Sequence, residues 1–170
     1  CRVVEVYAIG GLVAASAHTT RRELLATFSS PEFRTALSHY HLSADLDYET
    51  PPDQRPTLNS FLSWAARKRG LPAVSLWVPV PFYLLSVGDP QAQRRVIEFL
   101  DQRFDLGIDF SDLNAETQKQ YEQLARLRND FPEVDALMGR LESNLVLSRE
   151  ENEKLAQRVR EYLPGNGVRL

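Results

Sequence analysis

The sequence predicts an α/β protein in which a helix-covered sheet is followed by a helical C-terminal part. Residues Ala73 to Val78 form a short, nearly all-apolar run, as expected of a strand buried on both faces. Strand-like and helix-like patterns alternate along the chain as far as Phe104, which favours a parallel sheet. From Ser111 onward three helical segments follow with almost no strand signal. We therefore predict two parts, an α/β part over residues 1–110 and a helical part over residues 111–170.

The composition is that of a globular protein with a core. The chain has 170 residues, of which 43% are hydrophobic and 25% are charged. A net charge of -3 argues against a dedicated nucleic-acid binder, which is usually basic. The single cysteine, Cys1, excludes an internal disulfide and fits a reducing compartment. No apolar run approaches the roughly 20 residues that span a bilayer, and no signal peptide is evident. We expect a cytoplasmic protein that binds neither nucleic acid nor membrane.

The first elements are short. Val3 to Ile9 reads as a strand that ends at Gly10 and Gly11, where the backbone can turn or approach another group closely. Leu24 to Phe28 is a second strand candidate. Ser30 and Pro31 then supply an N-cap and a first-turn proline for a helix that extends to about Tyr40. Residues 43–56, rich in proline and aspartate, are predicted to be a loop.

A second helix and the central strand follow. Helical spacing resumes from Thr57 to Arg69, and Gly70 with Pro72 marks its end. The strand from Ala73 then runs into a corner of prolines and aromatics. Ligands of α/β sheets sit beyond the carboxyl ends of the strands, so this corner is a candidate position for a site. The expected apolar face of the helix consists of Leu58, Phe61, Leu62 and Ala65, and the corner consists of Pro79, Pro81, Phe82 and Tyr83.

The remaining helices carry clear start signals. Asp89 and Pro90 form a cap and first-turn proline for a helix that reaches Phe104. The last helix opens with a capping box from Ser148 to Glu151. The helices of residues 111–163 are amphipathic, so they must bury their apolar stripes against each other, the sheet or a partner. We expect them to form a lid over the carboxyl edge of the sheet.

The usual catalytic and metal-binding motifs do not fit. Gly10 and Gly11 are not followed by the Gly-Lys-Ser/Thr of a P-loop, and there is no Gly-x-Ser-x-Gly elbow. The three histidines, His18, His39 and His41, lack the spacing of metal ligands on one helix. We therefore expect no metal and no cofactor.

One polar constellation remains, just past the first strand. His18, Thr19 and Arg21 supply an imidazole, a hydroxyl and a guanidinium group that could bind an anionic or polar small ligand. In the alternative interpretation, this is a loop whose polar groups satisfy backbone groups or make an oligomer contact.

Taken together, these residues resemble the proteasome assembly chaperone 2 family in its bacterial, largely actinobacterial, branch. Two motifs depart from the family pattern, which often has Pro-His-Thr-Arg-Pro and Pro-His-Tyr. Ala17 and Thr20 change the first motif, and Phe82 replaces the histidine of the second. The matching features are Gly10-Gly11, His18-Thr19, Gly70 to Trp77 running into Val80-Pro81-Phe82-Tyr83, Asp89 to Ala92, and Leu141-Glu142.

The resemblance implies a three-layer α/β/α sandwich like that of nucleoside phosphorylases and related hydrolases, with a C-terminal helical extension over the crevice. It also implies further N-terminal strands that this chain lacks. Family members of this branch have no assigned function, and some carry labels as carboxylate-amine ligases.

Two functions follow as hypotheses. The first is an interaction or assembly protein without catalysis that forms homo-oligomers, with a trimer as one form. The second is a small-molecule binder or enzyme acting on a small anionic or nucleoside-like substrate, with the carboxylate-amine ligase as a variant. For the second, the expected crevice is lined by Gly10, Gly11, His18, Thr19, Arg21, Trp77 and Tyr83.

Overall fold

The computed structural model describes residues 2–43, 55 and 57–163. Expectations for Cys1 and for most of the loop at residues 43–56 lie outside these residues. The chain divides into two compact units, which we describe separately: Cys1–Leu12 with Glu23–Val78, and Val13–Arg22 with Pro79–Leu170. Within the described part of the chain, none of the helices has the length and apolar character needed to cross a membrane.

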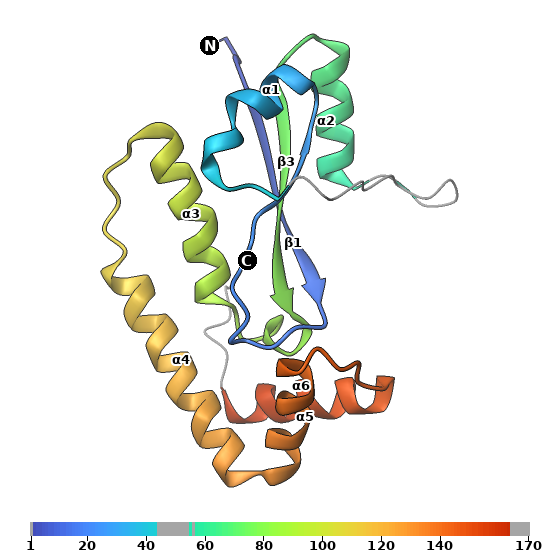
Figure 1. Cartoon of the computed structure of the whole chain (residues 1–170), viewed down its shortest axis with the longest axis vertical. Coiled ribbons are helices and arrows are strands. Elements are labelled where there is room, and N and C mark those ends of the chain that lie inside the picture. Colours follow the sequence, from blue (N-terminus) through green and yellow to red (C-terminus); the bar gives the residue numbers. More distant parts are fainter. Residues whose placement is uncertain (1, 44–54, 56, 164–170) are drawn as a thin grey trace. The chain divides into compact units, whose positions relative to one another are not determined.

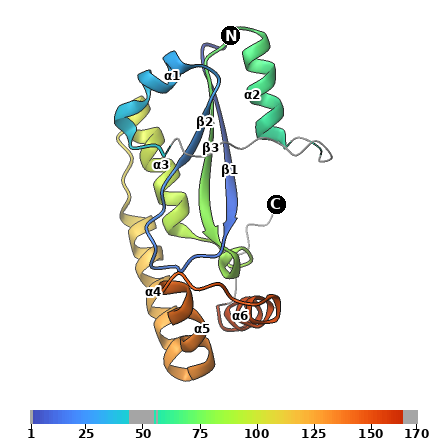
Figure 2. The same ribbon diagram turned by 45° about the vertical axis from the view of Figure 1, so that its right-hand side comes forward.

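The first unit is built around three strands, β1 (Val6–Ala14), β2 (Leu25–Phe28) and β3 (Ala73–Pro81). They lie in the order β1-β3-β2, so β3 is the interior strand, as predicted (Figure 1, Figure 2). Leu76 in β3 is fully buried, which accounts for the apolar run in the sequence.

The sheet is mixed, which corrects the expectation of a parallel sheet. The arrowheads of β1 and β3 point the same way (Figure 1), but β2 pairs with β3 in the antiparallel sense, with Leu25 opposite Trp77 and Phe28 opposite Val74. Alternation of strands and helices favours parallel pairing when each connection carries the chain back to the end of the sheet at which the preceding strand began. The long connection between β2 and β3 allows the opposite direction equally well.

Two strand boundaries also differ from expectation. Gly10 and Gly11 lie inside β1, not at its end, because the strand continues to Ala14. Pro79 and Pro81 lie within β3, and only Phe82 and Tyr83 follow it, in the short 3-10 turn η2 (Phe82–Leu84).

The helices of the first unit begin where the local signals place them, but α1 ends at Ala36 and does not extend to Tyr40 as expected. Helix α1 (Pro31–Ala36) is capped by Ser30, whose hydroxyl accepts the backbone N–H of Phe33, and the 3-10 turn η1 (Ser38–Tyr40) follows it. Helix α2 (Leu58–Lys68) is capped by Thr57. It ends at Lys68, and Gly70, which follows the C-cap Arg69, has a φ of 65°, the left-handed conformation expected of a glycine stop signal.

Helix α2 packs on the sheet through its polar side, not its apolar one. The buried residues of the helix are Asn59 and Ala66, and Ser63 Oγ lies 2.7 Å from Ser75 Oγ of β3. Of the predicted apolar face, Leu58 and Phe61 are 71% and 53% exposed, whereas Leu62 and Ala65 are partly buried. Hydrophobic periodicity shows which residues share a face, but the small residues of this helix allow its polar face to approach the strand.

The second unit contains η2 and helices α3 (Pro90–Phe104), α4 (Ser111–Asp130), α5 (Pro132–Glu142) and α6 (Arg149–Tyr162). The start signals are confirmed: the Asp89 side chain accepts the N–H of Ala92, and Ser148 and Glu151 form the reciprocal capping box.

An apolar core joins helices α4, α5 and α6 of the second unit to η2. Tyr83 and Leu84 belong to the same buried cluster as residues of α4, α5 and α6, and η2 contacts α6. The expected packing of the late helices against the aromatic corner is therefore present at Phe82 and Tyr83. The division at residue 110 and the opening of a lid stay predictions. The buried core residues include Ala17, Leu124, Leu127, Met138, Leu141, Leu155 and Val159.

Candidate functional site

The centre of the second unit is a buried pair formed by His18 and Tyr83. The backbone N–H of His18 donates to the phenol oxygen of Tyr83 at 2.6 Å, and the same oxygen lies 3.1 Å from His18 Nδ1. Because the phenol oxygen already accepts a hydrogen bond, its own proton is available for Nδ1. The proton shared by this contact is on the phenol oxygen or on Nδ1, according to the tautomer of the imidazole.

Both side chains are held in their uncharged forms. Burial, reinforced by the positive charge of Arg128, lowers the pKa of His18 from 6.5 to about 4. Burial also raises the pKa of the Tyr83 phenol well above its ordinary value. A group suited to general acid–base catalysis titrates near the working pH, and neither residue does so near neutrality.

Tyr121 of α4 closes this pair on one side. Its hydroxyl lies 3.1 Å from the carbonyl oxygen of His18 and 3.1 Å from Gln91 Oε1, so its proton serves two acceptors. Its ring lies edge-on to the imidazole of His18, with the ring centres 5.5 Å apart. The histidine is thus packed as a structural element of the core.

A buried ion pair fixes the loop that carries His18. Arg22 Nε donates to Asp89 Oδ2 at 2.9 Å, and both side chains are only 2% exposed. The terminal nitrogens of Arg22 donate to the backbone carbonyls of Ala17, His18 and Thr20. Since Asp89 also caps α3, this one guanidinium group joins the loop to the start of that helix.

Thr19 faces a second ionic group at the surface of the same unit. Its hydroxyl is 3.4 Å from Glu142 Oε1, and Glu142 accepts two hydrogen bonds from Arg128 at 2.7 and 3.1 Å. These bonds lower the pKa of Glu142 and raise that of Arg128. Arg128 also donates to Asp135 at 2.6 Å, so α4 and α5 are linked by a three-residue cluster.

The candidate residues of the first unit make a packing contact. A Cβ atom at Gly10 would lie 2.8 Å from Trp77 Cζ3 and 3.0 Å from Asn59 Nδ2. Glycine is required here because the indole ring lies directly on the strand backbone. Gly11 is an exposed position of β1.

Of the seven predicted residues, the structure brings His18 and Tyr83 into contact and places Gly10 against Trp77. Arg21 lines a polar pocket in the second unit. A single crevice formed by all seven stays a prediction. Among the described residues, no group of three or more His, Cys, Asp or Glu side chains could hold a metal ion.

Sequence reasoning missed Arg22, Asp89 and Tyr121 as parts of this network. The sequence indicates Asp89 only as a helix cap, and no pattern singles out Arg22. Arg22 and Asp89 are 67 positions apart, so no local pattern joins them.

Comparison with known proteins now identifies the family. The sequence model of the PAC2 family matches residues 1–128 of this chain. The chain belongs to the PAC2 family. Its resemblance to the proteasome assembly chaperones is therefore confirmed. Among curated proteins, none matches the sequence.

Solved structures support the fold of this PAC2 chain. A Corynebacterium glutamicum protein of unknown function superposes with a TM-score of 0.70 at 18% identity, over 84% of this chain and 50% of that one. A PAC2 family protein from Streptomyces avermitilis gives 0.62 at 24% identity, over 74% and 50%. PbaA of Pyrococcus furiosus, described as an archaeal homologue of proteasome-assembly chaperone, gives 0.57 at 22% identity, over 84% and 56%. The chain thus spans about half the length of these relatives.

Proposed function

We propose that this PAC2 chain is a protein-binding protein that works without catalysis and associates through the exposed apolar face of α2. The observation that carries the proposal is the orientation of that helix. Leu58, Phe61 and Trp64 follow one another at helical spacing and are 71%, 53% and 53% exposed. We call these three residues the α2 stripe. Large aromatic and aliphatic side chains grouped on one helix face mark a contact surface.

The first occupant we propose for the α2 stripe is a second copy of this chain. Two identical stripes bury each other when the helices pair across a two-fold axis. The basic residues Arg67, Lys68 and Arg69 gather at the C-terminal end of the helix. In an antiparallel pair these ends lie about 16 Å apart, the length of an 11-residue helix, which exceeds the Debye length at physiological salt. Like charges therefore do not oppose this pairing.

The buried network of the second unit favours binding over catalysis. His18 is neutral and Tyr83 is protonated near neutral pH, and each hydrogen-bonds the other, so neither supplies an acid or base to a substrate. The name of the archaeal relative, a homologue of proteasome-assembly chaperone, supports the same class of function.

The proposal extends to the layer arrangement of the fold and to the oligomeric state. We propose a three-layer α/β/α arrangement, supported by contacts of the first unit: α2 meets β3 at Ser75, while Phe33 of α1 packs against Tyr7 of β1. Gly10 of β1 faces Asn59 of α2. Tyr7 lies three positions earlier in β1, and residues an odd number of positions apart in a strand point to opposite faces. Helices α1 and α2 therefore contact opposite faces of β1. We also propose that the chain forms a homo-oligomer and that it belongs to the actinobacterial branch of the family, as the sequence resemblance implies.

The test is the molar mass in solution. We expect the wild-type chain to be an oligomer by light scattering, and Trp64→Glu to shift it to the monomer because a charge on the stripe cannot be buried unpaired. The matched control is Leu106→Ser, because Leu106 is also 55% exposed but lies outside the stripe. An unchanged mass for Trp64→Glu, or a monomeric wild type, overturns the second copy as the occupant.

A further inference from the structure

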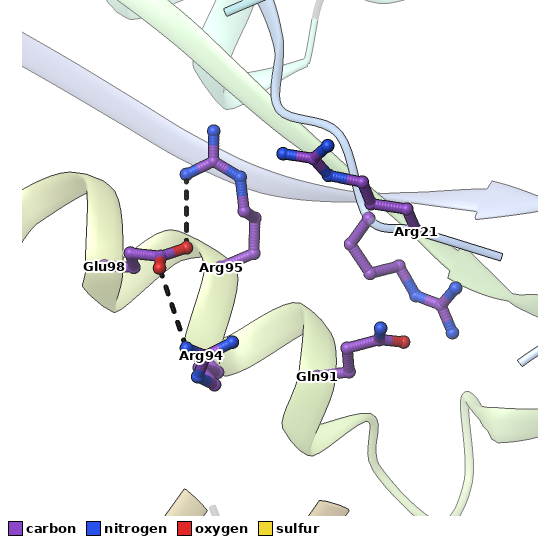
Figure 3. Close-up of a pocket in the computed structure, with 6 residues that line it drawn as sticks. Arg21, Gln91, Arg94, Arg95 and Glu98 are labelled. Carbon is purple, nitrogen blue, oxygen red and sulfur yellow. Dashed lines mark ion pairs between the residues drawn. The ribbon is translucent and has the colours of Figure 1, made fainter. Parts of the chain in front are cut away.

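The second unit contains a polar pocket of about 190 Å³. No apolar side chain lines it, which is unusual for a pocket that takes a drug-like molecule. Three of the lining positions, Arg94, Arg95 and Glu98, lie on one face of α3, and Figure 3 shows their side chains. The complete lining is Arg21, Arg22, Gln91, Arg94, Arg95 and Glu98.

The ion pair described above borders the pocket through Arg22. Arg22 is turned toward Asp89 and three backbone carbonyls, so it is a positioning residue and not a free donor. Its neighbour Arg21 is exposed and lines the same pocket as the α3 residues. In Figure 3 the side chains of Arg21 and Arg95 extend toward each other.

The charges in the pocket are unevenly matched. Glu98 Oε1 lies 3.7 Å from Arg94 Nη2, and Glu98 Oε2 lies 3.8 Å from Arg95 Nη1, both longer than hydrogen bonds. Arg21 makes no hydrogen bond or ion pair with the described part of the chain. Arg94 Nε is shielded from solvent and has no hydrogen-bond partner among the described residues. Arg21 and Arg94 therefore have donor capacity to spare in this pocket.

We propose that this pocket binds a small anion through its phosphate group. Guanidinium groups offer paired N–H donors that match the spacing of phosphate oxygens, and several of them together favour a dianion. A volume of about 190 Å³ equals the space of roughly six liquid waters, which suits a phosphate group with a small substituent.

Each residue has a defined part in this site. Arg21, Arg94 and Arg95 supply the positive charge around the anion. Gln91 Oε1 accepts the hydroxyl of Tyr121, so its amide Nε2 is the group that can donate into the pocket. Glu98 competes with the anion for the guanidinium groups of α3. The proposal stands apart from the α2 stripe, because a phosphate titration does not measure self-association.

The first test titrates the whole chain with inorganic phosphate, followed by ³¹P NMR and by the midpoint of thermal unfolding. We expect saturable binding in the wild type. Arg21→Gln and Arg94→Gln should each weaken it by about tenfold, the loss of one charge-assisted contact. Arg149→Gln is the matched control, because Arg149 is a 92% exposed arginine of the same unit outside the pocket, and it should leave binding unchanged.

Glu98→Gln gives a test of opposite sign. Removal of the competing carboxylate should tighten phosphate binding several-fold, whereas a merely structural role for Glu98 would weaken it or leave it unchanged. Further titrations with a nucleoside monophosphate and with succinate separate the sources of the anion. A nucleotide that binds at least as tightly as phosphate supports a phosphate-bearing ligand. Succinate binding as tightly as phosphate, no saturation up to about 10 mM phosphate, or equal affinities of wild type and Arg21→Gln would each overturn the proposal.

Discussion

The phenol oxygen of Tyr83 lies 2.6 Å from the backbone nitrogen of His18 and 3.1 Å from its Nδ1, so one side chain engages both the main chain and the ring of the same residue. Burial lowers the pKa of His18 to about 4, so the imidazole of this pair is neutral near pH 7. His18 therefore acts as part of the core, and its burial has a consequence for stability at acid pH.

We expect the stability of the protein to fall between about pH 6.5 and pH 4 because of His18. Its pKa is lowered to about 4 in the folded chain, so the unfolded chain takes up the proton first as the pH drops. Above the unfolded pKa both states are neutral and the effect vanishes. Below the folded pKa the loss is complete and amounts to at most about 3 kcal/mol.

His18→Asn tests this prediction by urea unfolding at a series of pH values. The amide oxygen of asparagine can still accept the Tyr83 hydroxyl, but it does not titrate. Between pH 6.5 and pH 4, the free energy of unfolding of the variant should lack the His18-dependent decrease seen in the wild type. At lower pH both proteins should lose stability as carboxyl groups such as Glu142, whose pKa is also lowered, become protonated. Equal slopes in both proteins would contradict the prediction.

The Arg22–Asp89 pair should be sensitive to removal of either partner. Arg22→Met leaves the Asp89 carboxylate buried without its cation, and breaking a buried pair in this way costs about 3 kcal/mol or more. The measurement is the free energy of unfolding in urea. Arg149→Met is the control, because the Arg149–Glu153 pair has the same 2.9 Å distance but is 92% and 66% exposed. We expect less than about 1 kcal/mol there, and similar losses in the two variants would refute the argument.

The same glycine-to-alanine change should have opposite effects at two positions. Gly10→Ala places a methyl group 2.8 Å from Trp77 and should destabilise the protein by about 1–3 kcal/mol. Gly139→Ala in α5 meets no atom within 4 Å and should stabilise it by up to about 1 kcal/mol through helix propensity. Trp77→Phe should recover part of the Gly10→Ala loss, because the two ring atoms nearest the new methyl group are absent in phenylalanine. A loss at Gly10 that is independent of the ring at position 77 would count against a steric cause.

The proposed lid makes a prediction for hydrogen exchange. We expect the amides of residues 111–163 to open as one group before those of β3, and η2 to open with them, since Tyr83 and Leu84 share their core. Inorganic phosphate should slow this opening if the pocket beside α3 is occupied. Exchange of residues 111–163 together with Val74 and Leu76 of β3 would exclude a lid.

Signals that act within one turn of chain were read correctly from the sequence. Ser30, Asp89 and Ser148 each cap the helix that follows, and Gly70 takes the left-handed conformation that ends α2. These features depend on side chains and backbone groups three or four residues apart, so their physics is visible in the sequence itself.

The errors arose where the outcome depends on distant residues. The inward side of α2 is decided by Ser63 meeting Ser75, a contact that periodicity does not encode. The role of Gly10 depends on the Trp77 ring across the sheet, and the direction of β2 depends on the path of a long connection. The contact between His18 and Tyr83, 65 positions apart, is likewise invisible in any local pattern, and the seven-residue crevice stays a prediction.

The two tryptophans of this chain, Trp64 and Trp77, both belong to the first compact unit. Indole fluorescence is therefore a built-in reporter of that unit alone, while far-ultraviolet circular dichroism is dominated by the four long helices of the second. Unfolding followed by both signals shows whether the two units melt in one cooperative step: coincident curves mean a single transition, and separated curves give each unit its own midpoint. The placement of two side chains thus makes the coupling between the halves of the molecule measurable without any label.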